Sequence, residues 1–225
     1  FSEEQLALEI TKGRAGLLLR ISGYNGQPND DFVSVEVFGK VWTNGVVPQH
    51  GGNDVWSPYA DSIEIGNAVD WALDAYVADS LLVARLPHFS LAFRPNVGEN
   101  DNAFTVELEE AVLSGTLEQG TTSFVLKNGN MAARWPTAAA LRAFRVFDYF
   151  GSFMCNGNLA FGVLKPKICG YADIMGTAAQ DNQAHSCDAI SWGAGFETEP
   201  AKLGSPNTPT QVPSTCAETW NPSCF

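Results

Sequence analysis

Basic residues are scarce in this sequence: 13 lysines and arginines are set against 25 aspartates and glutamates in 225 residues, so the formal net charge is −12. No run of basic residues offsets this excess. Because a surface of this charge repels phosphate groups, we expect no direct binding to nucleic acid or to an anionic membrane surface. The sequence also lacks any apolar stretch near the ~18 residues that a membrane span needs, so we expect no membrane insertion.

Several catalytic and metal-binding motifs are missing as well. The three histidines are His50, His88 and His185, and none has a second histidine three to five residues away, as a helical zinc site requires. There is no Gly-x-Ser-x-Gly nucleophile motif and no Cys-x-x-Cys pair. These absences favour a non-catalytic protein, although a triad assembled from distant residues stays open.

Cleavage of a glycosidic bond requires two carboxylates that face each other across a groove. The glutamates on or near expected strands are Glu36, Glu64, Glu107, Glu109 and Glu110. Glu107 and Glu109 are two residues apart and would share one face of a sheet. A solvated outer face is the alternative interpretation of these acids.

The composition predicts many turns around an aromatic core. Charged residues make up only 17% of the chain, whereas there are 21 glycines, 12 prolines and 14 phenylalanines. We find no internal repeat and no clear linker, so we expect residues 1–225 to form a single domain. Within it we distinguish a β-sandwich part (1–133), a helical part (134–175) and a disulfide-linked C-terminal wrap (176–225).

Short apolar or alternating segments with turn residues between them dominate the sequence before residue 134. The expected strands are Gly16–Ser22, Phe32–Phe38, Asp74–Leu86, Phe89–Arg94, Phe104–Leu108, Ala111–Glu118, Ser123–Leu126 and, near the end, Ala189–Phe196. Such spacing is typical of antiparallel sandwiches. The sequence therefore predicts a mainly β fold, an antiparallel β-sandwich of jelly-roll or concanavalin-like type.

One or two helices should accompany the strands. Ala138–Phe150 supplies helix formers with apolar residues at three-residue spacing, and Gly151 follows as a stop signal. A second helix over Leu159–Ile174 is weaker because it contains Gly162 and Pro166.

All five cysteines lie in the last third of the chain, at positions 155, 169, 187, 216 and 224. This clustering favours disulfides that staple the C-terminal segment, and hence an oxidising compartment: the exterior, the cell surface or the periplasm. We expect a Cys216–Cys224 pair across a short turn-rich loop and a bonded Cys169. The partner of Cys169, either Cys155 or Cys187, stays open.

Two further features agree with export. The chain opens on Phe1 rather than Met, as in a protein whose leader is removed or in a fragment. There is no Asn-x-Ser/Thr acceptor site with x other than proline, which mildly favours a bacterial exterior.

Four short strings carry a resemblance: Gly23-Tyr-Asn-Gly26, Ala75-Tyr-Val-Ala78, Arg134-Trp-Pro-Thr137 and Ile168-Cys-Gly-Tyr-Ala-Asp-Ile174. With the cysteine-bearing end of the chain, they resemble uncharacterised secreted bacterial proteins that have a sandwich-like front part and a cysteine-bearing tail. The resemblance implies a secreted β-sandwich and implies no activity or functional residue.

Clusters of acidic and amide side chains in turns suggest calcium as a cofactor. Carboxylate and amide oxygens are the ligands that Ca²⁺ prefers, and the candidate ligands are Asp30, Asp31, Glu99 and Asp101. None of the clusters matches the EF-hand pattern. The alternative is that these residues build turns by bonding to their own backbone.

Aromatic residues give a candidate ligand site. Trp42, Trp56 and Tyr59 lie in or beside the long loop after the first strands, where exposed rings would hold a sugar. The alternative is that they pack over the end of the sheet. Trp71, Trp135 and Trp192 have apolar neighbours and are assigned to the core.

Together these observations predict an exported, non-catalytic binding or structural protein that contacts polysaccharide or a surface protein. One alternative is a secreted hydrolase that acts on polysaccharide. Another is a subunit of an extracellular assembly or a homo-oligomer, for which the odd cysteine is the hint.

Overall fold

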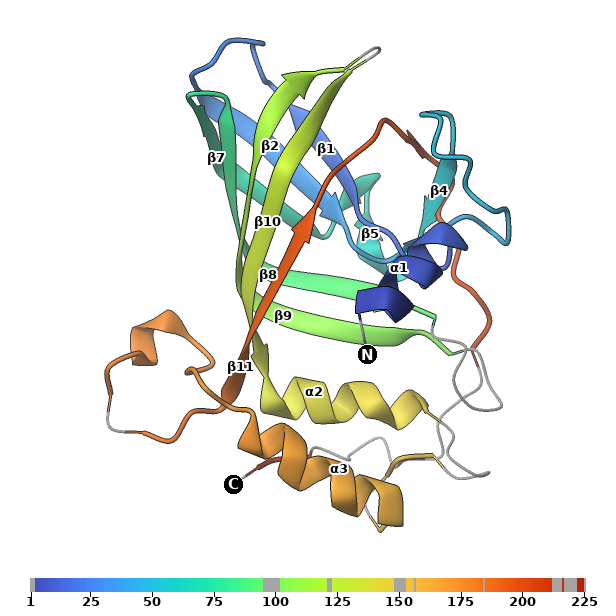
Figure 1. Cartoon of the computed structure of the whole chain (residues 1–225), viewed down its shortest axis with the longest axis vertical. Coiled ribbons are helices and arrows are strands. Elements are labelled where there is room, and N and C mark those ends of the chain that lie inside the picture. Colours follow the sequence, from blue (N-terminus) through green and yellow to red (C-terminus); the bar gives the residue numbers. More distant parts are fainter. Residues whose placement is uncertain are drawn as a thin grey trace.

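A seven-stranded antiparallel sheet forms the body of the protein (Figure 1). The computed structural model describes residues 3–94, 102–120, 123–147, 153–155, 157–183, 185–211, 216 and 222–224. In spatial order the strands are β1 (Leu18–Ser22), β2 (Asp30–Phe38), β7 (Asp70–Ala78), β8 (Leu81–Phe93), β9 (Phe104–Gln119), β10 (Phe124–Pro136) and β11 (Ala189–Phe196). The predicted mainly β, antiparallel fold is confirmed, and its strand order is that of a meander from β7 to β10.

Small elements form a second layer on the inner side of this sheet. They are a three-stranded sheet of β12 (Lys202–Leu203), β4 (Val55–Pro58) and β3 (Val41–Trp42), the pair β5 (Ile63–Glu64) and β6 (Asn67–Ala68), and helix α1 (Glu3–Thr11). Leu6 of α1 packs against the main core. The arrangement is therefore sandwich-like, with one large and one small layer (Figure 1).

The core lies on the inner face of the curved sheet because alternate residues of each strand point there. On β9 the buried residues are Phe104, Val106, Leu108, Ala111 and Leu113, followed by Leu117. Leu108 and Ala111 are three residues apart, so the two-residue period is interrupted between them. Glu110 at this point has φ of +48°, and the pairing with β10 shifts register, which identifies a β-bulge.

Similar irregularities occur in the neighbouring strands. The register between β2 and β7 shifts where Ala72 and Ala75 both face the core. On β8, Leu86 and Phe89 are both buried although they are three residues apart. As a result the sheet bends at this level, where β8 and β9 turn sharply in Figure 1.

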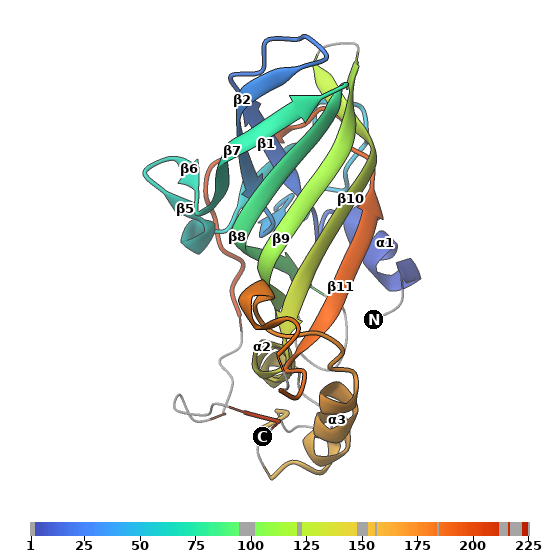
Figure 2. The same ribbon diagram turned by 90° about the vertical axis from the view of Figure 1, so that its left-hand side faces the viewer.

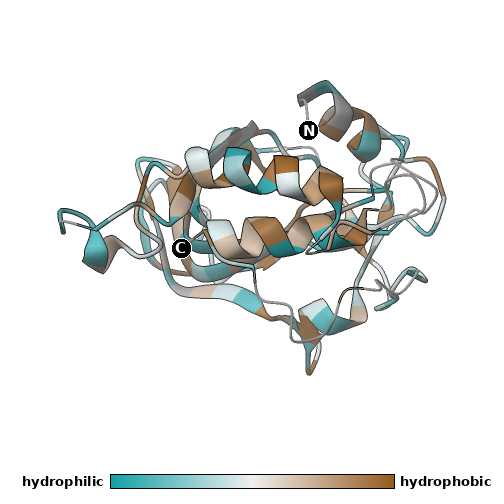
Figure 3. Ribbon diagram, turned by 90° about the horizontal axis from the view of Figure 1, so that it is seen from below, coloured by the Kyte–Doolittle hydropathy of each residue, from teal (hydrophilic) through white to brown (hydrophobic). Residues whose placement is uncertain are grey.

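Two helices close one end of the sheet. Helix α2 (Thr137–Ala143) continues as a 3₁₀ turn, Phe144–Val146, and α3 (Leu159–Gly170) lies beside α2, as Figure 3 shows from below. The Phe104 ring stacks on Phe147 with centroids 5.2 Å apart and meets Phe144 edge-on at 5.1 Å. These rings join the helical end to the core of the sheet.

Both predicted helices are present, with shorter bounds. The first was expected to reach Phe150, but regular α-helix ends at Ala143, and residues 148–150 lie outside the described part of the chain. The second ends at Gly170 rather than Ile174 and accommodates Pro166. Asn158 caps it by accepting the backbone N–H of Ala160 (2.8 Å).

Several strand predictions need correction, since the expected strand Phe89–Arg94 is the end of β8 and Ser123–Leu126 covers only the start of β10. The segment Asp74–Leu86 was expected to be a single strand, but it contains the end of β7, a hairpin turn and the start of β8. The turn residues Asp79 and Ser80 both adopt positive φ (50° and 66°). Phe104–Leu108 and Ala111–Glu118 are one strand, β9, interrupted only by its bulge.

The predicted Cys216–Cys224 disulfide is wrong. Cys216 pairs with Cys155 and Cys224 pairs with Cys169, whereas Cys187 is free. Cys169 is bonded, as expected. Cys224 packs in the apolar cluster between α2 and α3, so the C-terminal cysteines bind to the helical segment rather than to each other.

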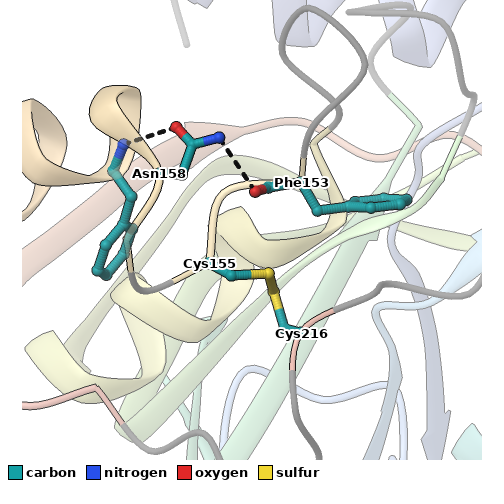
Figure 4. Close-up of a disulfide and its surroundings, with 5 residues drawn as sticks. Phe153, Cys155, Asn158 and Cys216 are labelled. Carbon is teal, nitrogen blue, oxygen red and sulfur yellow. Dashed lines mark hydrogen bonds between the residues drawn. A yellow bond between two sulfur atoms is a disulfide. The ribbon is translucent and has the colours of Figure 1, made fainter.

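Both disulfides therefore fasten the end of the chain to the same region. Figure 4 shows Cys155–Cys216 beside the start of α3, where Asn158 Nδ2 donates to the carbonyl oxygen of Phe153 (3.3 Å). Two disulfides are typical of a protein of an oxidising compartment. None of the described helices is long and apolar enough to cross a membrane.

Removal of one disulfide should destabilise the protein. We expect the double variant Cys169→Ser, Cys224→Ser to lower the free energy of unfolding by about 2–5 kcal/mol, because the crosslink restricts the unfolded chain. Chemical denaturation measures this change. Cys187→Ser is the matched control and should change stability little, since that thiol is unbonded; equal losses in both variants would contradict the assignment.

The inner face of the sheet should carry most of the stability. Leu113 is fully buried (0% exposed) whereas Leu81 is 42% exposed on the same sheet. We expect Leu113→Ala to cost about 2–5 kcal/mol in a denaturation experiment and Leu81→Ala to cost much less. Similar losses for the two variants would contradict the assignment of Leu113 to the core and of Leu81 to the surface.

Candidate binding site on the outer face of the sheet

The sheet irregularities determine which polar residues reach the outer face, the side that faces the viewer in Figure 2. Beside the bulge, Glu109 and Glu110 are both at least partly exposed, and their neighbours on β8, Pro87 and His88, are exposed too. Asp74 is exposed at the irregularity in β7. The bend therefore gathers polar groups from adjacent strands at one level of the sheet.

A shallow depression of about 830 Å³ crosses this face. It extends from Trp71 and Asp74 on β7, past Arg85 on β8 and Val112 on β9, to Arg134 on β10. Trp71 was assigned to the core by its apolar neighbours, and this assignment is wrong: its side chain is 46% exposed. Its neighbour Ala72 faces the core instead.

A hydrogen-bonded cluster around Arg134 forms one wall of the depression. The guanidinium binds both carboxylate oxygens of Asp181 (2.9 and 2.6 Å) and lies 3.0 Å from Glu110 Oε2. It also donates to the carbonyl oxygen of Met175 (2.8 Å), and Glu110 accepts the backbone N–H of Ala178 (2.8 Å). These bonds hold the loop between α3 and β11, with its 3₁₀ turn Ala178–Gln180, against the outer face.

The same contacts change the acidity of the groups involved. The hydrogen bonds from Arg134 hold the pKa of the Asp181 carboxyl below its usual value, and Asp181 in turn raises the pKa of Arg134. Arg134 and Asp181 are therefore both charged at neutral pH, where their ion pair contributes to this wall of the depression.

Two charged side chains in the depression form no polar contact with the described residues. Asp74 and Arg85 are exposed, and neither side chain forms a hydrogen bond or ion pair with a described residue. Both therefore remain available to a ligand that lies on the Trp71 ring. Val112, opposite Arg85 in the β8–β9 register and 39% exposed, adds apolar surface on the β9 side of Arg85.

The glutamates of β9 that were considered for glycoside cleavage each contact a basic side chain. Glu107 lies 3.4 Å from Arg142 and Glu109 lies 2.6 Å from His88 Nδ1, while Glu110 contacts Arg134. Each of these carboxylates is therefore engaged by a neighbouring side chain.

The carboxyl at the start of β7, Asp70, has a pKa that is raised rather than lowered. Burial raises the pKa of Asp70, opposed by the backbone N–H of Ser90 (3.0 Å) and by the charges of Lys40 and His88. Sequence analysis did not single out Asp70, because its burial depends on how β7 and β8 pack.

The aromatic residues of the predicted ligand site lie outside the depression and are packed against other residues. Trp56 and Tyr59 are buried (7% and 3% exposed), and Trp42 packs against the Tyr59 cluster with Arg94 over its ring at 5.7 Å. The structure thus favours the packing alternative for these residues. Trp135 and Trp192 pack against the main core, as predicted.

The described residues include only two of the four predicted calcium ligands, Asp30 and Asp31. The Asp30 carboxylate accepts the backbone N–H groups of Asn25 (2.8 Å) and Phe32 (3.1 Å), which is the turn-building role. Asp31 is exposed on β2, and Glu99 and Asp101 lie outside the described residues. In the described ranges, no group of three or more His, Cys, Asp or Glu side chains could hold a metal.

Comparison of the chain with family models, curated proteins and solved structures finds no match. The resemblance to secreted bacterial proteins therefore stays a prediction.

The loop over the outer face should loosen at low pH. Because the pKa of Asp181 is lowered in the folded protein, its contact with Arg134 contributes at any pH above the usual value of 3.8 and is lost as the pH falls below that value. We expect faster amide exchange in residues 176–183 below this pH, measured by hydrogen–deuterium exchange. Asp181→Asn should show fast exchange already at neutral pH, whereas Asp79→Asn, which changes an exposed turn residue, should behave like the native protein.

Proposed function

We propose that the protein is an exported, non-catalytic binding protein that holds polysaccharide on the outer face of its main sheet. The observation that carries the proposal is the Trp71 ring, exposed in a shallow depression beside Asp74 and Arg85. A flat ring offers apolar surface to the C–H face of a sugar, and the charged groups beside it bond to hydroxyls.

The shape and chemistry of the depression suit a chain-like ligand. It is shallow and crosses several strands, so a polymer can enter and leave without its ends being enclosed. Tyr76, which is 42% exposed on β7, and Val112 extend the apolar surface beyond Trp71. The disulfides support an oxidising compartment, where such a ligand would be met.

The contacts on β9 favour binding over hydrolysis, because the three β9 glutamates considered for cleavage are engaged by Arg134, His88 and Arg142. The proposal does not require calcium, and the test below measures its influence directly.

Polysaccharide binding should depend on Trp71. On a glycan array with and without calcium, followed by titration calorimetry on the glycans retained, we expect Trp71→Ala to weaken binding about tenfold or more, a loss of about 1.4 kcal/mol. Phe32→Ala is the control, since it removes an aromatic ring that is more exposed than Trp71 (85% against 46%) and lies outside the depression.

Two outcomes would contradict the proposal. One is an array on which the native protein retains no glycan. The other is a glycan that binds Trp71→Ala and Phe32→Ala as tightly as the native protein, which would place the ligand elsewhere.

A further inference from the structure

The last strand of the main sheet leaves part of its hydrogen-bonding edge unused. β11 pairs with β10 on one side only and is the outermost strand in Figure 2. Gly193 and Gly195 pair with Ala132 and Asn130 of β10, and both glycines are exposed. We infer that this edge binds an extended polypeptide segment, which adds an eighth strand to the sheet.

The direction of the backbone groups follows from the register. The Ser191 N–H bonds to the Asp173 carboxylate (2.7 Å), which lies on the side of β11 away from β10. In an antiparallel pair, every second residue points its N–H and C=O the same way. Gly193 and Gly195 therefore direct their N–H and C=O groups to the open edge, where no described residue accepts or donates to them.

The protein itself begins the eighth strand and then stops. Ile174 forms an antiparallel bridge with Ala189. At the next position along the edge, the Asp173 carboxylate accepts hydrogen bonds from the backbone N–H and the hydroxyl of Ser191. Beyond Ser191 the described chain provides no further partner. The vacant stretch of about four residues, up to Phe196, spans ~13 Å, enough for a short strand.

Nothing in the composition of β11 protects this edge. Exposed edges are usually blocked by lysine, other charged residues, proline or a bulge, and Ala189–Phe196 contains no charged residue and no proline. The exposed glycines also leave room for a close approach of another backbone. The required pattern of alternating donors and acceptors is that of a polypeptide, which determines the class of partner.

The charges around the edge select among polypeptides. Asp173 and Asp188 lie at its start, and both accept hydrogen bonds from neutral groups rather than from cations. At the other end, Glu197 is paired with Lys127 and Glu199 with His50 (2.7 Å each), so the unpaired carboxylates lie at the start of the edge. A strand with a basic residue beside Asp173 and Asp188 complements this arrangement, and a second copy of a chain with net charge −12 does not.

Amide exchange and affinity measurements on the intact, oxidised protein test the inference. The probe is a short synthetic peptide of alternating valine and threonine with a lysine at each end. We expect it to protect the Gly193 and Gly195 amides from exchange. The same peptide with N-methyl groups on alternate amides, or with glutamate in place of lysine, should bind at least tenfold more weakly.

Two variants of one residue form the matched pair. Gly195→Pro removes an edge N–H and should weaken the peptide about tenfold, whereas Gly195→Ala keeps the N–H and should bind within about twofold of the native protein. The alanine is tolerated because its Cβ would meet nothing closer than the Gly129 carbonyl oxygen at 3.8 Å. Thermal unfolding verifies that both variants fold, and the N-methylated peptide gives a readout that needs no variant.

Two results with the peptide would overturn the inference: no protection of the amides at millimolar peptide, or equal affinity for the N-methylated peptide. Concentration-dependent self-association that Gly195→Pro abolishes would also overturn it, because a second copy of the chain would then be the occupant. Equal affinity for the glutamate peptide would overturn the charge selection. Trp71→Ala should leave peptide binding unchanged, so this test and the polysaccharide test fail independently.

Discussion

Burial on one face of a bent antiparallel sheet is the constraint on which the rest of the structure depends. Leu82, Leu86, Leu108 and Leu113 from β8 and β9 are almost fully buried on the inner face. To keep such residues inward along strands that bend, the sheet interrupts its two-residue period at adjacent positions of β7, β8 and β9. Each interruption leaves an additional polar residue outside, so the packing of the core also determines the chemistry of the outer face.

Regular segments were predictable from sequence, and local irregularities were not. β11 has the predicted bounds, and β2 starts two residues before its predicted position. The turn at Asp79–Ser80 was missed because it contains neither glycine nor proline, although both residues adopt positive φ. The disulfide pairing was missed because nearness along the chain says little about which cysteines the fold brings within bonding distance.

The candidate site illustrates the same limit. Trp56 and Trp71 both stand among apolar and small residues, yet Trp56 is buried and Trp71 is partly exposed. Their positions depend on strand phase, which shifts within β7 between Ala72 and Ala75. The alternation of Ala75 and Val77 was an available signal for Asp74 and Tyr76, whereas the shift before Ala75 hides the face on which Trp71 lies.

The two disulfides cross along the chain, because Cys155 and Cys169 both precede Cys216 and Cys224 and bond to them in the same order. A protease that cuts once between Cys169 and Cys216 would therefore produce a two-chain protein rather than two separate fragments. Reduction of either disulfide alone would still leave the halves linked. A cut between Cys169 and Ala189 places β11 in the second chain, where it still pairs with β10 of the first and completes the main sheet.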